Sequence, residues 1–301
     1  MYELRQVFQD NRLGDLIGIT LKLTWPPTPE GKKMEQATLF DTPEKTALPA
    51  APVERLVNWS ATDCQLLHGD CLQVMFDLPD NSVDMVCCDM PFGTTACVWD
   101  TVLPLEMLWH HYKRIVKDNG AILLFAQTPF DKVLGASNLQ MLKYELIWEK
   151  TKATGHLNAK KMPMKAHENI LVFYKKLPTY NPQKTTGHNP VNSYTKHTQD
   201  GDCYGETKVG ISGGGATDRY PRSVQMFASD TQKSSLHPTQ KPLALIENLI
   251  ATYSNEGDVV LDNCMGSGTT GVACKNLNRA FIGMELDKEY FEIATKRIQS
   301  S

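Results

Sequence analysis

The sequence lacks the features that mark membrane, secreted and metal-stabilised proteins. No apolar run in its 301 residues approaches the ~20 residues that a membrane helix needs. The first residues, MYELRQVFQDNRL, carry charges throughout and lack the apolar centre of a secretion signal. The eight cysteines form neither a Cys-x-x-Cys pair nor a Cys/His cluster at zinc spacing. We therefore expect a cytoplasmic, reduced protein without disulfides, a metal site or membrane contact.

A strong net charge is also absent, but the charges are distributed unevenly. The chain carries a formal net charge of −3. Residues 150–184 nevertheless contain eight lysines and a single acid, Glu168, which gives this segment a charge of +7. Such a segment favours a polyanionic partner, and the alternative is a solvated lysine face.

Apolar residues, 41% of the chain, follow alternating strand and helix patterns from residue 63 onward. The expected strands are 65–70, 82–88, 121–126, 143–150, 168–176, 258–262 and 279–286. The expected helices are 71–78, 105–118, 130–140, 242–254, 268–278 and 288–298, with Asn119-Gly120 as the C-cap of the second. This alternation predicts an α/β fold with a mostly parallel sheet that helices cover on both faces.

The N-terminal part has a different composition. Residues 25–55 are rich in proline, threonine and alanine and are typical of a linker. We therefore divide the chain into an N-terminal extension with a Pro-rich linker, 1–61, and one domain, 62–301. The QATLF segment, from Gln36 to Phe40, resembles the short peptide with which bacterial proteins dock on the replication sliding clamp. The alternative is a loop that packs one aromatic side chain on the core.

Four carboxylates stand where predicted strands end. They are Asp70, Asp89, Asp262 and Glu285. In open α/β sheets, ligands bind beyond the carboxyl ends of the strands. We therefore expect these side chains along one edge of the sheet.

A glycine-rich turn follows one of these strands. Residues 259–271, VVLDNCMGSGTTG, combine a strand, a tight turn and a helix start, and Gly266, Gly268 and Gly271 satisfy the pattern G-x-G-x-x-G. Glu285 follows Gly266 by 19 residues, at a position where an acid can accept both hydroxyls of a ribose. The pattern indicates an adenosine-type cofactor, and the alternative is a turn that only packs a helix on a strand.

Two features argue against a nicotinamide cofactor. Only 30 residues follow Gly271, so the second half of a dinucleotide fold is missing. Asp262, just before the loop, would repel a pyrophosphate and attract a cationic amino-acid group. S-adenosylmethionine carries a ribose, an ammonium and a sulfonium, and it fits these residues better.

Several motifs together resemble one enzyme family. DMPF at 89–92 resembles the D-P-P-Y motif of DNA amino-methyltransferases, LDNCMGSGTT resembles their S-adenosylmethionine loop, and HPTQKP at 237–242 resembles the segment before that loop. LLHGDCLQVM, YELIWEK and HENILVFYKK match in kind and order, so the resemblance covers roughly residues 62–300. The D-P-P-Y-type motif precedes the cofactor loop, as in the beta group. The resemblance implies a permuted Rossmann-like methyltransferase domain over 62–301, with a target-recognition insertion at about 152–235.

The resemblance also implies a reaction, the transfer of a methyl group to N6 of a flipped-out adenine at a specific DNA site. Asp89 and the carbonyl of Met90 would each accept a hydrogen bond from one N–H group of the amine and stabilise its developing charge. Pro91 would fix the backbone, and Phe92 would stack on the base, a contact worth about 1–3 kcal/mol. A base in duplex DNA must leave the stack first.

The remaining site residues follow from the same resemblance. The implied cofactor residues are Asp70, Cys71, His237, Thr239, Lys241, Asp262, Gly266, Ser267, Gly268, Thr269, Thr270 and Glu285. The implied DNA contacts are Lys150, Lys152, Lys160, Lys161, Lys165, Arg219 and Arg222. Asp70 has an alternative role as a helix N-cap, and Thr239 and Pro242 have one as a helix start. Cys87 and Cys88 are predicted to pack within their strand.

Two departures from the family pattern leave the activity and the substrate open. Met90 stands where the family usually has proline, and Phe92 where it usually has tyrosine; we expect activity to survive both, with a weakened or silent enzyme as the alternative. Cytosine-N4 enzymes more often carry serine at the position of Asp89, so this aspartate favours adenine. Methylation of RNA or of a protein glutamine is a rival hypothesis, and so is a non-catalytic DNA-binding module. The sequence leaves open a homodimer, a restriction endonuclease partner and a bacterial or phage origin.

Overall fold

Strands and helices alternate through the described part of the computed structural model, which comprises residues 54–56, 64–93, 100–195, 210–229 and 240–301. The strands are β1 Glu54–Leu56, β2 Cys64–His68, β3 Val83–Cys88, β4 Val116–Ala126, β5 Leu142–Thr154, β6 Lys165–Phe173, β7 Tyr194–Thr195, β8 Ser212–Gly213, β9 Val224–Phe227, β10 Val259–Asp262 and β11 Ala280–Glu285. The helices are α1 Cys71–Val74, α2 Leu105–Ile115, α3 Phe130–Ser137, α4 Leu243–Tyr253, α5 Thr269–Asn276 and α6 Lys288–Ser300, with 3-10 turns at Met75–Asp77 and His156–Asn158.

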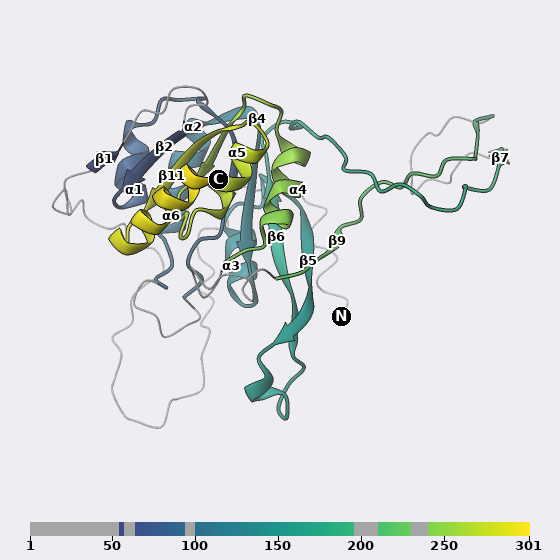
Figure 1. Cartoon of the computed structure of the whole chain (residues 1–301), viewed down its shortest axis with the longest axis horizontal. Helices are drawn as coiled ribbons and strands as arrows, with labels where there is room; N and C mark the ends of the chain where they lie inside the picture. The colour runs from purple at the N-terminus through teal and green to yellow at the C-terminus, as the bar shows by residue number, and fades with distance from the viewer. Residues whose placement is uncertain (1–53, 57–63, 94–99, 196–209, 230–239) are drawn as a thin grey trace, which may run out of the picture. The chain divides into compact units, whose positions relative to one another are not determined.

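The central sheet has the strand order β1-β2-β11-β10-β3-β4-β6-β5-β9 (Figure 1). Strands β2, β11, β10, β3 and β4 run parallel to one another. Strand β6 is antiparallel to both β4 and β5, and β9 lies parallel to β5 at the edge. The predicted α/β class with a mostly parallel sheet is therefore confirmed.

Helices cover both faces of the sheet because successive strand residues point to opposite sides. Val86 and Cys88 of β3 pack with residues of α1, α2 and α3, among them Leu108 and Leu134. Met85 and Cys87 of the same strand pack with residues of α4, α5 and α6 on the other face. Both cysteines are buried, which confirms their predicted packing role.

The end of α2 differs from the prediction. The helix ends at Ile115, and Val116 is already extended (φ −81°, ψ 129°) and pairs with Val83 of β3. A helix through residue 118 with an Asn119-Gly120 cap is therefore wrong. The pairing shifts before Ala121, and a Cβ at Gly120 would lie 2.8 Å from the carbonyl oxygen of Asp84. Gly120 thus serves a close approach between strands.

The predicted division of the chain differs from the sheet in two places. Strand β1 lies within the predicted N-terminal extension and pairs antiparallel with β2. Strands β6 and β9 lie within the predicted insertion at 152–235 and belong to the central sheet. Between them, β7 and β8 form a separate two-stranded sheet. Segment 36–40 lies outside the described residues, and among the described helices none is long and apolar enough to cross a membrane.

Candidate active site

The four predicted strand-end carboxylates do follow one edge of the sheet. Strands β2, β11, β10 and β3 are parallel neighbours, so their carboxyl ends lie together. The register places His68 opposite Glu285 and Asp262 opposite Gly283. Asp70 and Asp89 follow the ends of β2 and β3. The edge thus joins the glycine loop and the DMPF motif.

Glu285 lies against the glycine loop, as the ribose prediction requires. Its Oε2 accepts a hydrogen bond from the backbone N–H of Gly266 at 2.8 Å, and its Oε1 accepts one from the backbone N–H of Asp287 at 2.9 Å. Each carboxylate oxygen keeps a lone pair for a further donor, so the residue can still accept ribose hydroxyls. Burial raises the pKa of Glu285, and these backbone donors oppose that rise.

The loop needs glycine at its second position for a packing reason. Gly268 has a φ of 78°, and a Cβ there would lie 3.0 Å from the Cβ of Ala294 in α6.

Asp262 accepts two hydrogen bonds from the glycine loop and its start. The hydroxyl of Thr270 donates to Oδ2 of Asp262 at 2.6 Å, and the N–H of Cys264 donates to Oδ1 at 3.1 Å. Burial raises the pKa of Asp262 to about 7. Asp262 therefore closes the loop onto β10.

The other predicted loop residues have a partner that the sequence did not indicate. Arg297 of α6 donates from Nη1 to Oγ of Ser267 at 3.2 Å and to Oγ1 of Thr269 at 2.9 Å. Both serine and threonine are buried, and so is Thr270. These three hydroxyl residues hold the loop in place.

Asp70 and Cys71 reach the same edge from β2. Oδ1 of Asp70 accepts the N–H of Leu72 at 2.9 Å, which confirms its predicted role as a helix N-cap. Cys71 is buried, with its sulfur 3.6 Å from Nδ2 of Asn263 beside the loop. His237 and Thr239 lie outside the described residues.

The DMPF motif is anchored at three points. The Met90 side chain is buried in the core, and the Phe92 ring stacks on Phe130 with centroids 5.5 Å apart. Oδ1 of Asp100 accepts hydrogen bonds from the N–H groups of Phe92 and Gly93, both at 2.8 Å. Asp100 is not among the residues predicted from the sequence, although this acid closes the same stretch, CCDMPFGTTACVWD. The aspartate holds the backbone that follows Pro91.

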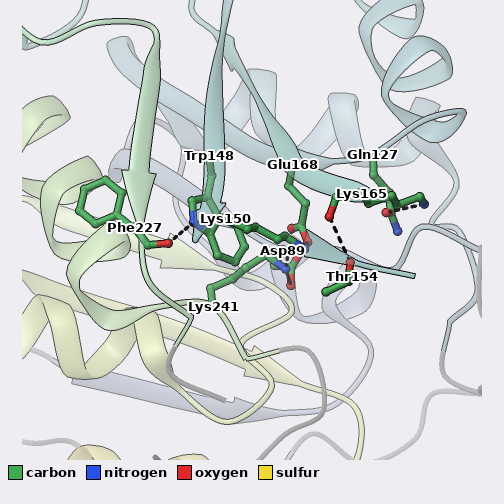
Figure 2. Close-up of polar contacts among 9 residues, drawn as sticks. All are labelled: Asp89, Gln127, Trp148, Lys150, Thr154, Lys165, Glu168, Phe227 and Lys241. Carbon is green, nitrogen blue, oxygen red and sulfur yellow. Dashed lines mark hydrogen bonds and ion pairs between the residues drawn. The ribbon is translucent and has the colours of Figure 1, made fainter. Parts of the chain in front are cut away.

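Asp89 itself pairs with a lysine. The ammonium of Lys241 donates to Oδ2 of Asp89 and lies 3.4 Å from Oε2 of Glu168 (Figure 2). Oδ1 of Asp89 is buried and has no hydrogen-bond partner among the described residues. Burial raises the pKa of Asp89, and the charge of Lys241 opposes that rise. Lys241, predicted to hold the cofactor, here contacts the carboxylate of the DMPF motif.

Lys150 is also drawn into this site. Its ammonium lies 2.6 Å from Oε1 of Glu168 and 5.0 Å from the ring centroid of Trp148. The Trp148 indole in turn donates to the carbonyl of Phe227, which ties β9 to β5 (Figure 2). Lys150 therefore forms a largely buried ion pair, where the sequence predicted a DNA contact. In the sequence, Glu168 stands out only as the single acid of the lysine segment.

The other predicted DNA contacts divide into two groups. Lys152, Lys160, Lys161 and Arg222 are exposed, and the ammonium of Lys165 donates to Oε1 of Gln127 at 3.0 Å. The guanidinium of Arg219 donates instead to the carbonyls of Asn189, Ala216 and Asp218. Arg219 thus fixes the backbone near β8, whereas the exposed lysines lie on and beside the tip of the β5–β6 hairpin.

Comparison with known proteins agrees with this geometry. Residues 83–296 match the family model described as DNA methylase. The chain is 28% identical over 251 residues to the Type II methyltransferase M.HpaI of Haemophilus parainfluenzae, covering 79% of this chain and 75% of that protein. It is 29% identical over 253 residues to the DNA adenine methyltransferase YhdJ of Escherichia coli K12, covering 77% and 82%.

Solved structures show the same similarity. The M1.HpyAVI-SAM complex is 27% identical, with a TM-score of 0.55, and the match covers 77% of this chain and 98% of that one. The cytosine-N4-specific PvuII DNA methyltransferase shares the fold, with a TM-score of 0.58 at 14% identity over 80% of this chain and 91% of that one. The chain belongs to the DNA methylase family.

Proposed function

We propose that this protein transfers a methyl group from S-adenosylmethionine to N6 of adenine in DNA, at a specific site. The observation that carries the proposal is the buried Oδ1 of Asp89, which no described residue hydrogen-bonds, on the edge that also bears the glycine loop and Glu285. An acceptor and a cofactor loop on one sheet edge are the arrangement that methylation of an amino group needs.

The fit of the cofactor rests on the acids and the loop. Glu285 has acceptor capacity for ribose hydroxyls, and the loop brings its backbone to the same place. Asp70, Cys71 and the loop residues Gly266 to Thr270 would surround the rest of the molecule, with His237 and Thr239 as further predicted contacts. The bound cofactor supplies an electrophilic methyl group.

The chain's own residues prepare the nucleophile. Oδ1 of Asp89 would accept one N–H of the adenine amino group, and the carbonyl of Met90 would accept the other. Phe92 would stack on the base, and its ring is held in place by stacking on Phe130. Pro91 and Asp100 keep the motif backbone in one conformation.

The choice of adenine depends on Asp89. By resemblance, cytosine-N4 enzymes more often carry serine at this position. The similarity to YhdJ, described as a DNA adenine methyltransferase, supports the same choice. The similarity to the PvuII enzyme is a similarity of fold and does not bear on the base.

DNA would contact the hairpin between β5 and β6. Its tip exposes Lys160 and Lys161 together with Leu157, whose side chain is 94% exposed. Cations suit phosphates, and an apolar side chain beside them suits a groove or a base step. We assign target recognition to the parts of 152–235 that lie outside the central sheet. A second copy, a restriction endonuclease and a sliding clamp at Gln36 to Phe40 remain predictions from resemblance. A cytoplasmic location remains a prediction from the composition and the cysteine pattern.

The direct test identifies the methylated nucleoside. The full chain is incubated with methyl-tritiated S-adenosylmethionine and unmethylated duplex DNA, and the digested nucleosides are separated. We expect label in N6-methyl-2′-deoxyadenosine. Label in N4-methyl-2′-deoxycytidine would keep the enzyme class and overturn the base, and label found only with RNA would overturn the substrate.

A further inference from the structure

Four charged side chains of alternating sign form a row that ends at Asp89 of the DMPF motif. Lys150 contacts Glu168, and Lys241 lies between Glu168 and Asp89 (Figure 2). The four come from separate places in the fold: the end of β3, β5, β6 and the segment before α4. The side chains of Lys150 and Glu168 are each 13% exposed and that of Lys241 is 8% exposed. The formal charges of these four side chains cancel.

Stability alone does not explain this arrangement. Replacing buried ion pairs by apolar groups of similar volume is often neutral or stabilising, because the charges lose their hydration. A row of two largely buried lysines and two acids therefore points to a role at Asp89, the member of the row that would meet the substrate.

The contacts of Asp89 show what that role is. Lys241 engages Oδ2, so Oδ1 is the oxygen left without a partner among the described residues. Lys241 is itself confined, with its ammonium 5.9 Å from the ring centroid of Phe92 and 5.2 Å from that of Phe125. A carboxylate gripped at one oxygen presents the other in a fixed direction. Fixed orientation of an acceptor is worth a large factor in rate.

We propose that Glu168 is a positioning residue for methyl transfer, holding Lys241 so that Asp89 presents Oδ1 to the target amino group. The inference rests on the proposed function and deepens it. Glu168 also supplies the second negative charge of the row. Without it, the two positive charges of Lys150 and Lys241 would exceed the single negative charge of Asp89. That excess would oppose the positive charge that develops on the amine.

The same geometry gives a pH signature. The charged and titratable groups that face Asp89 are Lys241, Glu168 and Lys150, with Asp262 on β10 and the thiols Cys87 and Cys88 on its own strand. Lys241 and Lys150 lower the pKa of Asp89, whereas burial and Glu168 raise it. Loss of the Glu168 charge should therefore lower the pKa of Asp89, and loss of either lysine charge should raise it.

The test compares Glu168→Gln, Lys241→Met and the double variant with the wild type, using kcat, KM for DNA, cofactor affinity and the pH dependence of kcat. Glu145→Gln, at an exposed acid of β5, is the matched control. For Glu168→Gln we expect kcat to fall by about 10- to 100-fold with little change in KM. The acid limb of its pH profile should move to lower pH and that of Lys241→Met to higher pH. In the Lys241→Met background, Glu168→Gln should have little further effect, because Glu168 acts through Lys241.

Three results with an active wild type would overturn the inference and leave the proposed function intact. They are an unchanged kcat in Glu168→Gln, an acid limb that does not move, and effects of Glu168→Gln that simply add to those of Lys241→Met. A wild type without adenine methylation would overturn both. If Glu168→Gln does not fold, as judged by thermal unfolding and cofactor binding, Lys150→Met serves as the second variant, because Lys150 is the member of the row farthest from Asp89. Its acid limb should move to higher pH, and an unmoved limb would overturn the inference.

Discussion

Removal of the Asp100 carboxylate should slow methyl transfer without weakening cofactor binding. One oxygen of this buried side chain accepts the N–H groups of Phe92 and Gly93, both at 2.8 Å. Asp100→Ala leaves both donors without that acceptor. The backbone that presents the Met90 carbonyl and the Phe92 ring then loses its brace.

The magnitude follows from the two bonds. A hydrogen bond to a charged group contributes about 1.5–3 kcal/mol. Taking the lower value for each, because the buried Met90 side chain also anchors the motif, gives about 3 kcal/mol, or ~10²-fold in kcat. Asp100→Asn keeps an acceptor oxygen and loses only the charge, so its loss should be about 1–2 kcal/mol.

The assay is single-turnover methyl transfer at saturating DNA and cofactor, with cofactor affinity measured by calorimetry on the same preparations. Asp80→Ala is the control, because that carboxylate is 66% exposed in its pair with Arg114. Cofactor affinity should be little changed in all three variants. A fully active Asp100→Ala, or a loss confined to cofactor affinity, would refute the bracing role.

Three further predictions concern the loop and the hairpin. Asp262 has a pKa of about 7 when folded and near 4 when unfolded, so its contribution to stability is lost as the pH rises from about 4 to about 7. Asp262→Asn should therefore gain about 3 kcal/mol on the wild type between pH 5 and 8 in thermal unfolding, and parallel curves would contradict this. The double variant Lys160→Ala/Lys161→Ala should weaken DNA binding alike for all sequences and reduce the salt slope of binding by about 2, and an unchanged slope would exclude phosphate contacts there. Glu285→Gln keeps an acceptor for Gly266 but loses its charge, so cofactor affinity should fall by about tenfold in calorimetry; equal affinity would remove Glu285 from the ribose site.

The sequence predicted the parts of the site that depend on local patterns. Alternating strand and helix periods fix which segments are strands, and parallel pairing then brings the strand ends together. Asp89, Asp262 and Glu285 could therefore be placed on one edge from the sequence. The contact between Glu285 and the glycine loop follows from the same geometry.

The parts that were missed depend on contacts between distant segments. Lys241 and Asp89 are 152 residues apart, and their pairing depends on where the start of α4 lies against the end of β3. Glu168 resembled a lone acid among solvated lysines, and it is buried because β6 lies between β4 and β5. Asp100 could have been predicted, since a carboxylate eight residues after Phe92 is close enough in sequence to accept a hydrogen bond from its backbone N–H group.

The most direct test of the account measures methyl transfer and cofactor binding for Asp89→Asn beside the wild type. The substitution keeps the shape of the side chain and removes the charge that faces the target amine. We expect wild-type label in N6-methyl-2′-deoxyadenosine, and in the variant a loss of about 10²–10³-fold in single-turnover rate with cofactor affinity little changed. Transfer by Asp89→Asn at the wild-type rate would contradict the assignment of Asp89 and, with it, the mechanism.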